Sequence, residues 1–431
     1  MIDRQSEIVH AVNADFGGRA RQETLALELA PLVDAIRHTR RHLAGWMRPR
    51  RVRAGLNFFP ATARILYQPL GVIGIIGAWN YPVLLTLSPL VDAIAAGNHA
   101  LVKPSELAPA SAELLQKIIA DYFPEDYVAV VTGDAKVAAE FAASPFDHLI
   151  FTGSTRVGKL VMRAASENLT PVTLELGGKC PAIVHPEFPL RTAVERILTG
   201  KLYNAGQTCL APDYVFVHES QQEEFTKVAC EVARRLYPQW NGNPDYTRII
   251  NGAHYERLCD CVKDAAARGA GVIPLGEKTE RCNAENRIFR PVILQKVGDA
   301  MRVMQEEIFG PILPVLAYGD LEEALRYVND RPHPLALYYF DYNSNRVDRV
   351  LQSTVSGGVT VNDVIYHIAQ NNLPFGGVGS SGMGHYHGKA GFETFSKKKG
   401  VLIQSRFNTL AFLRPPYGPL SERVIRFLLR K

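Results

Sequence analysis

The sequence lacks any apolar run near the ~20 residues that a membrane-spanning helix needs. Its charge is also nearly balanced, because 48 basic and 43 acidic residues leave a net charge of only +5, which requires no nucleic-acid partner. Cysteine is scarce at six residues, and Cys259 and Cys261 are spaced for neither a zinc knuckle nor a Cys-x-x-Cys redox pair. Because the N-terminus is polar and shows no secretory signal, we expect a cytoplasmic globular protein without a resident metal.

Two segments have uneven composition. Seven arginines lie between residues 37 and 53, but helix-spaced apolar residues precede or interleave them, which favours a solvated helix face over a nucleic-acid surface. In the tail, residues 423–431 alternate apolar with basic side chains, a pattern that could form a short amphipathic helix on a membrane. Packing on the chain's own domain or on a partner subunit is favoured, so we expect at most peripheral membrane contact.

Short apolar segments alternate with helical ones along the chain. With 431 residues, two or three domains are expected. Strand-like segments alternating with helices predict a parallel sheet covered on both faces, and a second sheet of similar style follows. Residues 22–47 are predicted as a helix interrupted at Pro31, and the change of domain is placed at Gly177 and Gly178. The predicted strands are 63–68, 72–76, 100–103, 128–131, 148–151, 172–176 and 214–217, and the other predicted helices are 111–122 and 221–236.

Cys209 and Glu175 form the most informative pair. Cys209 lies among small residues at 204–212, and Glu175 ends a predicted strand before two glycines. A thiol can attack a carbonyl carbon, and a carboxylate can activate the water that releases the product. A lone cysteine is more often a small core residue and a lone glutamate more often a surface residue, but the open, glycine-containing setting of this pair favours covalent catalysis.

A glycine turn occupies residues 151–159, between a predicted strand and a predicted helix. Gly153, Ser154 and Gly158 would let the backbone approach a pyrophosphate at the helix N-terminus. The pattern is not Gly-x-Gly-x-x-Gly, and many such turns bind nothing. Alone, it leaves nucleotide binding and a plain turn equally open.

Lys103 and Glu106 follow another predicted strand. The lysine can donate to ribose hydroxyls and the glutamate can accept from them, and a carboxylate there would repel a 2′-phosphate. NAD is therefore favoured over NADP, although NADP remains possible. The alternative is an exposed turn in which Ser105 caps a helix.

Asn80 follows the strand at 72–76 and precedes Pro82. Its uncharged amide could hold the oxyanion that forms when a nucleophile adds to an aldehyde. A helix-capping asparagine is the alternative. Farther on, Glu307 could hold a nicotinamide ribose and Phe309 could pack near it, although residues 305–311 could also be only an acidic turn. The glycine-rich segment 373–384 indicates a packed loop.

Together, these motifs in this order resemble the aldehyde dehydrogenase superfamily from about residue 63 to 400. Residues 206–214 and 382–389 are similar to its class 3 branch, and residues 13–17, 406–408 and 415–418 are most similar to bacterial coniferyl aldehyde dehydrogenases. The resemblance implies an NAD-dependent, or NADP-dependent, oxidation of an aldehyde to its acid through a cysteine thiohemiacetal and thioester. Relatives usually carry several tens of residues ahead of Met1, so we expect a shortened set of N-terminal helices.

The resemblance also assigns residue roles. Cys209 matches the nucleophile, Glu175 the base and Asn80 the oxyanion donor. The positions matching cofactor contacts are Lys103, Glu106, Gly153, Ser154, Gly158, Glu307 and Phe309. Tyr81, Tyr203, Ile368 and His387 are expected along a substrate tunnel suited to a planar ring or a medium alkyl chain, although each could equally belong to the core.

The implied fold is α/β, with a Rossmann-type cofactor domain, an α/β catalytic domain and a strand extension that builds a homodimer. The expected boundaries are 1–50 and 70–176 for the cofactor domain, 177–385 for the catalytic domain, 51–69 and 390–405 for the extension, and 406–431 for the tail. Two rival functions remain: an acylating dehydrogenase that passes the thioester to coenzyme A, against which Glu175 counts, and a catalytically silent scaffold.

Overall fold

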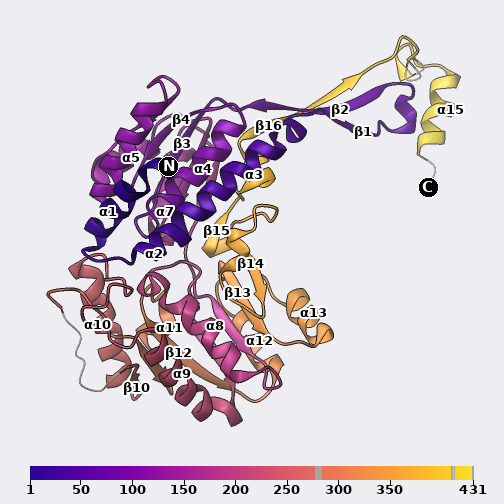
Figure 1. Ribbon diagram of the computed structural model, residues 1–431. Coiled ribbons are helices and arrows are strands. Elements are labelled where there is room, and N and C mark those ends of the chain that lie inside the picture. Colours follow the sequence, from indigo (N-terminus) through magenta and orange to yellow (C-terminus); the bar gives the residue numbers. More distant parts are fainter. Residues whose placement is uncertain (277–283, 409–410, 412, 430–431) are drawn as a thin grey trace.

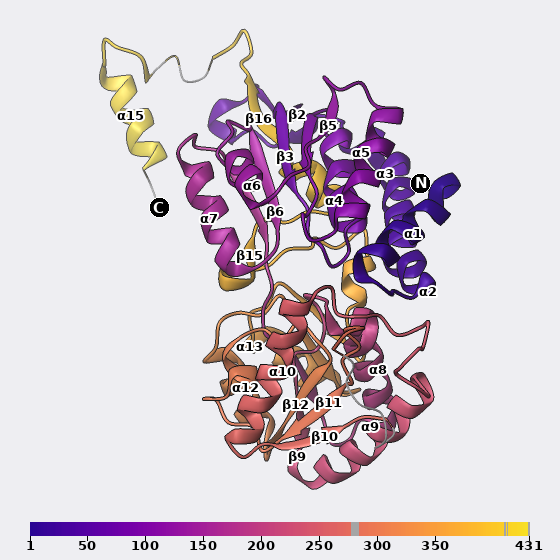
Figure 2. The same ribbon diagram turned by 90° about the vertical axis from the view of Figure 1, so that its left-hand side faces the viewer.

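The computed structural model describes residues 1–276, 284–408, 411 and 413–429. Two α/β layers, each built on its own sheet, are stacked against one another, and a ribbon of strands projects from them (Figure 1). The chain passes from the first sheet to the second at Gly177 and Gly178, between β7 and β8. The two sheets and their helices separate clearly when the molecule is turned (Figure 2).

The first sheet has the strand order β15-β7-β6-β3-β4-β5. Neighbouring strands within this sheet are parallel, apart from β15, which lies antiparallel to β7. The chain begins in the middle at β3, moves to β4 and β5 on one side, and then to β6 and β7 on the other, so a topological switch point lies between β3 and β6. The strands are β3 (Val72–Ile76), β4 (His99–Lys103), β5 (Val128–Val130), β6 (His148–Thr152), β7 (Val172–Glu175) and β15 (Gly382–Met383).

Helices cover both faces of this sheet (Figure 2). Burial on two sides explains why β3 and the central residues of β6, 149–151, are continuous apolar runs rather than alternating ones. The helices of this layer are α1 (Gln5–Phe16), α2 (Arg21–Thr24), α3 (Ala30–Trp46), α4 (Leu84–Ala95), α5 (Pro109–Tyr122), α6 (Ala135–Ala142) and α7 (Thr155–Ser166).

The sequence predicts that Pro31 interrupts the N-terminal helix, but in the structure the chain stays helical through this residue. A π-helical turn, Leu25–Leu29, joins α2 to α3, and Pro31 lies in the first turn of α3. A proline has no N–H to donate, and the hydrogen bond that it lacks falls where the helix changes from π to α geometry. The wider π turn therefore carries the chain into α3 without a break.

The second sheet has the order β10-β11-β12-β9-β8-β13-β14, parallel apart from the β10–β11 pair. Its strands are β8 (Pro181–Val184), β9 (Tyr214–His218), β10 (Gly271–Pro274), β11 (Val292–Gln295), β12 (Ile312–Tyr318), β13 (Ala336–Phe340) and β14 (Gly358–Val361). Its helices are α8 (Leu190–Leu202), α9 (Gln222–Leu236), α10 (Gly252–Ala267), α11 (Arg302–Gln305), α12 (Leu321–Asn329) and α13 (Ser344–Ser353).

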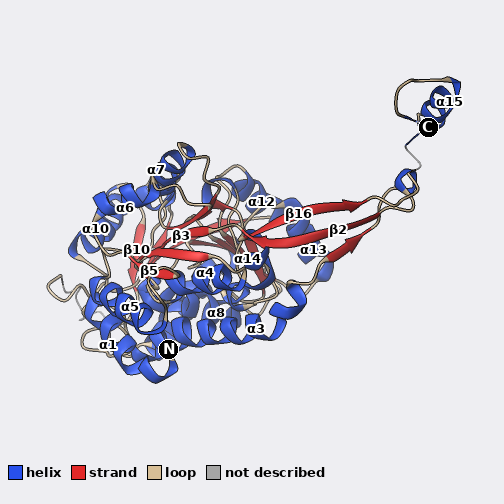
Figure 3. Cartoon of the chain, turned by 90° about the horizontal axis from the view of Figure 1, so that it is seen from above, coloured by secondary structure: helices blue, strands red, loops and turns tan. Residues whose placement is uncertain are grey.

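The projecting ribbon is an antiparallel sheet in the order β1-β2-β16 (Figure 3). Its strands are β1 (Arg50–Val52), β2 (Thr62–Pro69) and β16 (Ser396–Ile403). Residues 390–394, which the sequence analysis places in this extension, belong instead to helix α14 (Gly388–Thr394), which packs on α3 and α4. In the tail, α15 (Pro419–Leu428) lies at the far end of the ribbon. Within the described ranges, no helix is long and apolar enough to cross a membrane.

Candidate active site

Cys209 lies in a loop between α8 and β9 that has an unusual backbone. Asn204, Ala205 and Gly206 have successive positive φ angles of 52°, 51° and 74°. Left-handed backbone costs roughly 1–2 kcal/mol for a residue with a side chain. The surrounding structure must therefore hold this loop in place.

Hydrogen bonds from distant parts of the chain hold the loop. The Asn204 N–H donates to Glu23 Oε1 (3.1 Å), and the side chain of Gln207 donates to the carbonyls of Asn204 (2.9 Å) and Arg248 (3.0 Å). The Ile250 N–H donates to Gln207 Oε1 at 2.9 Å. The nucleophile loop is thus rigid before any ligand binds, as a preorganised catalytic site requires.

Gly206 offers a test of how tightly this loop is packed. A Cβ atom at Gly206 would lie 2.4 Å from the carbonyl oxygen of Gly310, whereas Gly242, with a similar φ of 73°, has open space around it. We expect Gly206→Ala to lower the unfolding free energy by at least about 2 kcal/mol more than Gly242→Ala, since only the former adds a backbone collision to the strain. Denaturant titration measures both; equal losses would contradict the tight packing.

Asn80 connects the first sheet to this loop. Its Nδ2 donates to the Gln207 carbonyl at 3.1 Å, two residues before Cys209. Its own carbonyl accepts from Asn204 Nδ2 (2.9 Å) and Arg19 Nη1 (2.8 Å). An amide nitrogen carries two N–H groups, so one remains to serve a reacting oxygen.

The alternative in which Asn80 caps a helix is not what the structure shows. At the start of α4, the N–H groups of Val83 and Leu84 donate instead to Glu28 Oε2, at 2.8 and 3.2 Å. Ser105 likewise does not cap α5, which begins at Pro109; Asp15 of α1 accepts the first-turn N–H groups of that helix. Both capping interpretations are therefore wrong.

A cavity of about 140 Å³ opens beside Cys209, and its lining is mostly apolar. Tyr81, Tyr203, Ile368 and His387 all line it together with the thiol. Tyr81 is fixed there by a 2.7 Å hydrogen bond between its hydroxyl and Thr208 Oγ1. The four side chains that the sequence analysis assigns to a substrate tunnel thus come from distant segments to one cavity.

The thiol and the nearby carboxylates affect one another electrostatically. Removal from water is the main cause that raises the pKa of the Cys209 thiol to about 12. The nearby carboxyl groups of Glu307 and Glu175 contribute to this rise, and the backbone N–H groups of Cys209 and Leu210 oppose it. The thiol is thus protonated at neutral pH in the free protein. A catalytic cycle must remove that proton before the sulfur can attack.

Glu175 ends β7, deep between the layers. The side chain is 3% exposed, and burial raises its pKa well above the ordinary value. Among the described residues, neither carboxylate oxygen has a hydrogen-bond partner. An unpaired buried carboxyl group is costly for stability, which is typical of a group that is kept for function.

The glycine turn lies directly beside Glu175. The Gly153 N–H donates to the Glu175 carbonyl at 3.0 Å, and Ser154 caps α7 by accepting from the Val157 N–H at 3.4 Å. A Cβ at Gly158 would lie 2.6 Å from Leu176 Cδ2, so glycine allows α7 to pack closely on the sheet. The turn presents a helix N-terminus at the carboxyl edge of the sheet, where a pyrophosphate fits.

Lys103 and Glu106 lie at the same edge, at the end of β4. The buried Lys103 Nζ is 3.1 Å from both Glu106 Oε2 and the Pro104 carbonyl oxygen. An ammonium has three N–H groups, so one remains for a ribose hydroxyl. The hydroxyl of Thr152, at the end of β6, is buried without a partner among the described residues. This edge therefore suits a dinucleotide.

Glu307 and Phe309 approach the site from the second layer. The Glu307 carboxylate lies against Gly177, where a Cβ would come within 1.9 Å of Oε2. Burial, helped by the nearby Asp213 and opposed by the Gly178 N–H, raises the pKa of Glu307 to about 8. Phe309 packs edge-on against Trp79, with ring centroids 5.3 Å apart, next to Asn80. Glu307 thus lies close enough to Cys209 to affect the pKa of its thiol, and Phe309 packs on the residue that precedes Asn80.

Sequence reasoning missed the charged residues that support the site from the N-terminal helices. The Arg19 guanidinium lies 4.9 Å from the centre of the Tyr81 ring and 3.4 Å from Glu28 Oε1, with both charged side chains fully buried. Glu23 accepts from Thr247 Oγ1 at 2.6 Å as well as from Asn204. The sequence does contain one indication of these residues: charged side chains stand at positions of an amphipathic segment that would face the core.

Within the part of the chain that the structure describes, no cluster of three or more His, Cys, Asp or Glu side chains could hold a metal ion. Sequence comparison matches residues 1–401 to a family model described as "Aldehyde dehydrogenase family". The chain is similar to a probable coniferyl aldehyde dehydrogenase of Pseudomonas aeruginosa, with 50% identity over 425 residues, covering 99% of this chain and 88% of that protein. It is also similar to a coniferyl aldehyde dehydrogenase of Pseudomonas sp., with 46% identity over 433 residues and 100% and 89% coverage.

A solved structure of Staphylococcus aureus AldH in its substrate-bound state superimposes with a TM-score of 0.93 at 39% identity, covering 99% of this chain and 92% of that one. The match extends over both sheets and the ribbon, because nearly the whole chain is aligned. The family and fold class predicted from the motifs are therefore confirmed.

Proposed function

Because the chain belongs to the aldehyde dehydrogenase family, we propose that Cys209, Glu175 and Asn80 are the residues with which it carries out that family's reaction. The enzyme oxidises an aldehyde to the carboxylic acid with NAD or NADP as the acceptor. The observation that supports the residue assignment most strongly is that Cys209 lines an apolar cavity while the Asn80 amide bonds to its loop. Replacing Cys209 tests the assignment directly.

In the first step, the Cys209 thiol gives up its proton to solvent, and the resulting thiolate forms a bond to the aldehyde carbon while the carbonyl electron pair moves to oxygen. The oxyanion is held by the Asn80 amide and the Cys209 N–H, and losing such a donor typically costs ~3–4 kcal/mol of transition-state stabilisation. The bound nicotinamide cofactor supplies a hydride acceptor. Loss of hydride from the carbon leaves a thioester on Cys209.

In the second step, Glu175 takes a proton from water, and the resulting hydroxide attacks the thioester carbon. The C–S bond then breaks, so that the acid leaves and the thiolate returns. Burial raises the pKa of Glu175, which makes its carboxylate a stronger base toward water.

The cofactor residues support a preference for NAD. Glu106 pairs with Lys103 at the predicted ribose position, and its carboxylate would repel a 2′-phosphate. Gly153, Ser154 and Gly158 would hold the pyrophosphate. Glu307 and Phe309 would hold the nicotinamide end.

We expect Glu106→Gln to shift the enzyme toward NADP. Removing the negative charge removes the repulsion, so the ratio of kcat/KM for NADP over NAD rises about 10-fold, equivalent to ~1.4 kcal/mol. Glu113→Gln, on the exposed face of α5, is the matched control. Steady-state assays with both cofactors measure the ratio, and an unchanged ratio would exclude Glu106 as the selecting group.

For the substrate, we infer a planar aromatic aldehyde or a medium-chain aliphatic one. The support is the mainly apolar lining around Cys209, together with the coniferyl aldehyde named for the two Pseudomonas relatives. The acylating alternative requires transfer of the thioester to coenzyme A, and the presence of Glu175 counts against it. Analysis of products with and without coenzyme A separates the two reactions.

We also propose that the enzyme is a cytoplasmic homodimer joined through the β1-β2-β16 ribbon. The outer strands of that sheet expose unpaired backbone together with apolar side chains such as Val52, Leu402 and Ile403, which favours pairing with another sheet. Free thiols at Cys180 and Cys230, besides Cys209, support a reducing compartment.

A further inference from the structure

Asp92 lies on α4 where that helix meets α14, and its carboxyl group is buried. The residue is 3% exposed, and burial raises the pKa of the carboxyl group to about 8, against the opposing effect of the His387 N–H. The group is therefore mostly neutral at pH 7, but burying even a neutral polar group costs free energy. Nothing in the reaction described so far uses Asp92.

The carboxyl group of Asp92 is bonded to the chain just before α14. Its Oδ2 accepts a hydrogen bond from the backbone N–H of His387, 3.0 Å away. A Cβ at Gly391, on α14, would collide with the same oxygen. Glycine at this position is therefore what allows α14 to come close enough for the bond to form.

His387 has a backbone conformation that its neighbours must impose. Its φ angle is 80°, in the region that residues with a side chain rarely adopt. The preceding residue is fixed by backbone hydrogen bonds of 2.9 and 3.1 Å between Tyr386 and Phe375. Asp92 supplies the bond at His387 itself, so it helps to hold this strained residue in place.

The imposed backbone carries the imidazole of His387 to the cavity at Cys209, which the ring lines. The ring is stacked on Phe375, with centroids 5.2 Å apart and planes 18° apart. Phe375 does not line the cavity, so the imidazole stands between Phe375 and the cavity. Burial lowers the pKa of His387 to about 4, and the ring is therefore a flat, uncharged wall at neutral pH.

Helix α4 connects Asp92 to the same cavity. Leu84, Leu85 and Ser88 of this helix line the cavity, whereas Asp92 does not. Asp92 follows Ser88 by four residues and therefore lies one turn farther along the same helix face. One face of α4 thus forms part of the cavity with its first turns and anchors the neighbouring wall with its last one.

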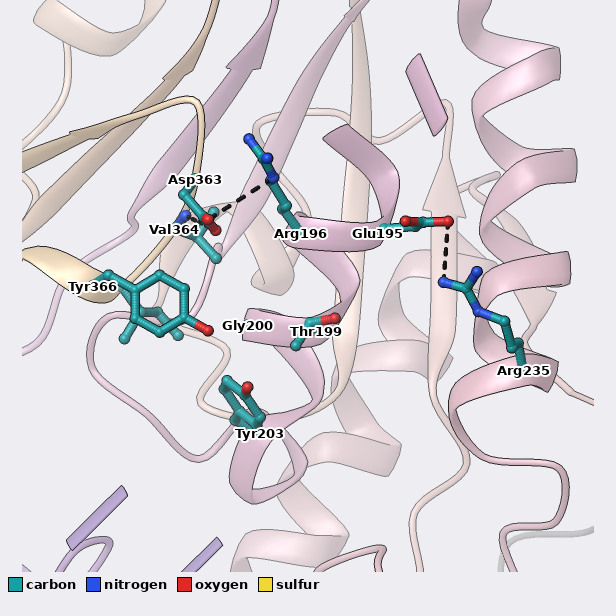
Figure 4. Close-up of a pocket in the computed structure, with 10 residues that line it drawn as sticks. Glu195, Arg196, Thr199, Gly200, Tyr203, Arg235, Asp363, Val364 and Tyr366 are labelled. Carbon is teal, nitrogen blue, oxygen red and sulfur yellow. Dashed lines mark hydrogen bonds and ion pairs between the residues drawn. The ribbon is translucent and has the colours of Figure 1, made fainter. Parts of the chain in front are cut away.

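Another part of the cavity lining is held by contacts in which Asp92 takes no part. The chain at 365–366 lines both the cavity and a second pocket of about 240 Å³ beside α8 (Figure 4). Arg196 of α8 donates to the carbonyl of Asn362, and its Nε is 3.8 Å from Asp363 Oδ2. Loss of Asp92 should therefore leave this part of the lining in place.

We propose that Asp92 is a positioning residue that holds the His387 imidazole as a flat wall of the cavity, and that it thereby favours planar aromatic aldehydes over saturated ones of similar size. The inference rests on the proposed function, because it assumes that the aldehyde carbon lies at Cys209. Asp92 acts through the backbone of His387, without touching the substrate.

The test compares benzaldehyde with cyclohexanecarbaldehyde, which has the same carbon skeleton but no flat ring. Asp92→Ala removes the acceptor of the His387 N–H, so the wall loses its fixed orientation. The kcat/KM for benzaldehyde relative to that for cyclohexanecarbaldehyde should then fall about 5-fold, the scale of one lost ring contact. We expect the change mainly as a higher KM for benzaldehyde.

Two further variants are the controls for Asp92→Ala. Asp92→Asn keeps an acceptor oxygen, and a carboxamide has nearly the shape of a neutral carboxyl group, so this variant should retain the unmodified ratio. Asp348→Ala, at an exposed aspartate of α13 that does not line the cavity, should retain it as well.

A double variant separates positioning from a general effect on folding. Because Asp92 acts through His387, we expect His387→Ala to lower the ratio alone and the added Asp92→Ala to lower it no further. Gly391→Ala pushes α14 away from Asp92 and should lower the ratio as well. Gly45→Ala, at a helical glycine whose Cβ would meet no described atom within 4 Å, is its control. Thermal unfolding of each variant establishes that it is folded in the assay.

The ratio compares two reactions at one active site, so a variant that merely loses folded enzyme lowers both values and leaves the ratio unchanged. An unchanged ratio in Asp92→Ala and Gly391→Ala, an equal loss in Asp92→Asn, or a further loss in the double variant would each overturn the positioning role. No NADH from either aldehyde with the unmodified enzyme would instead contradict the proposed function.

Discussion

Replacing Cys209 with alanine abolishes NADH formation with every aldehyde, while NAD still binds. Without the sulfur no covalent adduct forms, and loss of a covalent nucleophile lowers turnover by roughly 10⁴-fold or more. The proposed dinucleotide site lies at the carboxyl ends of β3, β4 and β6 and does not include Cys209. Binding of the dinucleotide should therefore change little. Absorbance at the NADH band measures turnover, and calorimetric titration measures binding.

Cys230→Ala is the matched control for that variant. Cys230 lies on α9, partly buried and away from the cavity at Cys209, so its removal tests the general effect of losing a thiol. Full activity in Cys230→Ala with none in Cys209→Ala supports the assignment. Normal turnover in Cys209→Ala would remove Cys209 from the reaction altogether.

Replacing Glu175 with glutamine separates the two halves of the reaction. Glutamine has nearly the same shape but cannot take a proton from water. The first turnover should therefore release about one NADH per active site as a burst, after which steady turnover falls by roughly 10²–10⁴-fold. Stopped-flow absorbance resolves the burst, and mass spectrometry detects the acyl group that remains on Cys209.

The pH profile gives the same variant a second readout. Burial raises the pKa of Glu175, so in the unmodified enzyme the base is protonated at low pH, and hydrolysis speeds up as pH rises toward that pKa. Glutamine does not titrate, so this rise should disappear from the steady-state rate. Glu322→Gln, which removes a carboxylate from a surface ion pair with Arg349, is the control. Unchanged steady turnover in Glu175→Gln would exclude Glu175 as the base.

The sheets were predictable because their strands are short apolar runs. The predicted strand at 72–76 coincides with β3, and 148–151 falls within β6. The positions of residues at strand ends were equally predictable, since the carboxyl ends of parallel strands share one edge of the sheet. Asn80, Lys103, Gly153 and Glu175 therefore meet there, as their positions after successive strands suggest.

The supporting contacts were not predictable, because they join residues far apart in the chain. The Arg19 bond to Asn80 spans 61 positions and the Glu23 bond to Asn204 spans 181. No local pattern reveals such partners. The left-handed backbone at Asn204 and Ala205 was also hidden, since neither residue is glycine and their strain is compensated by these distant bonds.

The origin of these contacts has a consequence for how heat affects the enzyme. Arg19 lies just before α2, and its guanidinium donates to the Asn80 carbonyl. Glu23 lies on α2, and its carboxylate accepts from the Asn204 N–H. Segments outside the sheets open at a lower free energy than central strands. Local opening of residues 19–24 would silence the enzyme while the sheets, and the bulk of the circular-dichroism signal, stay intact.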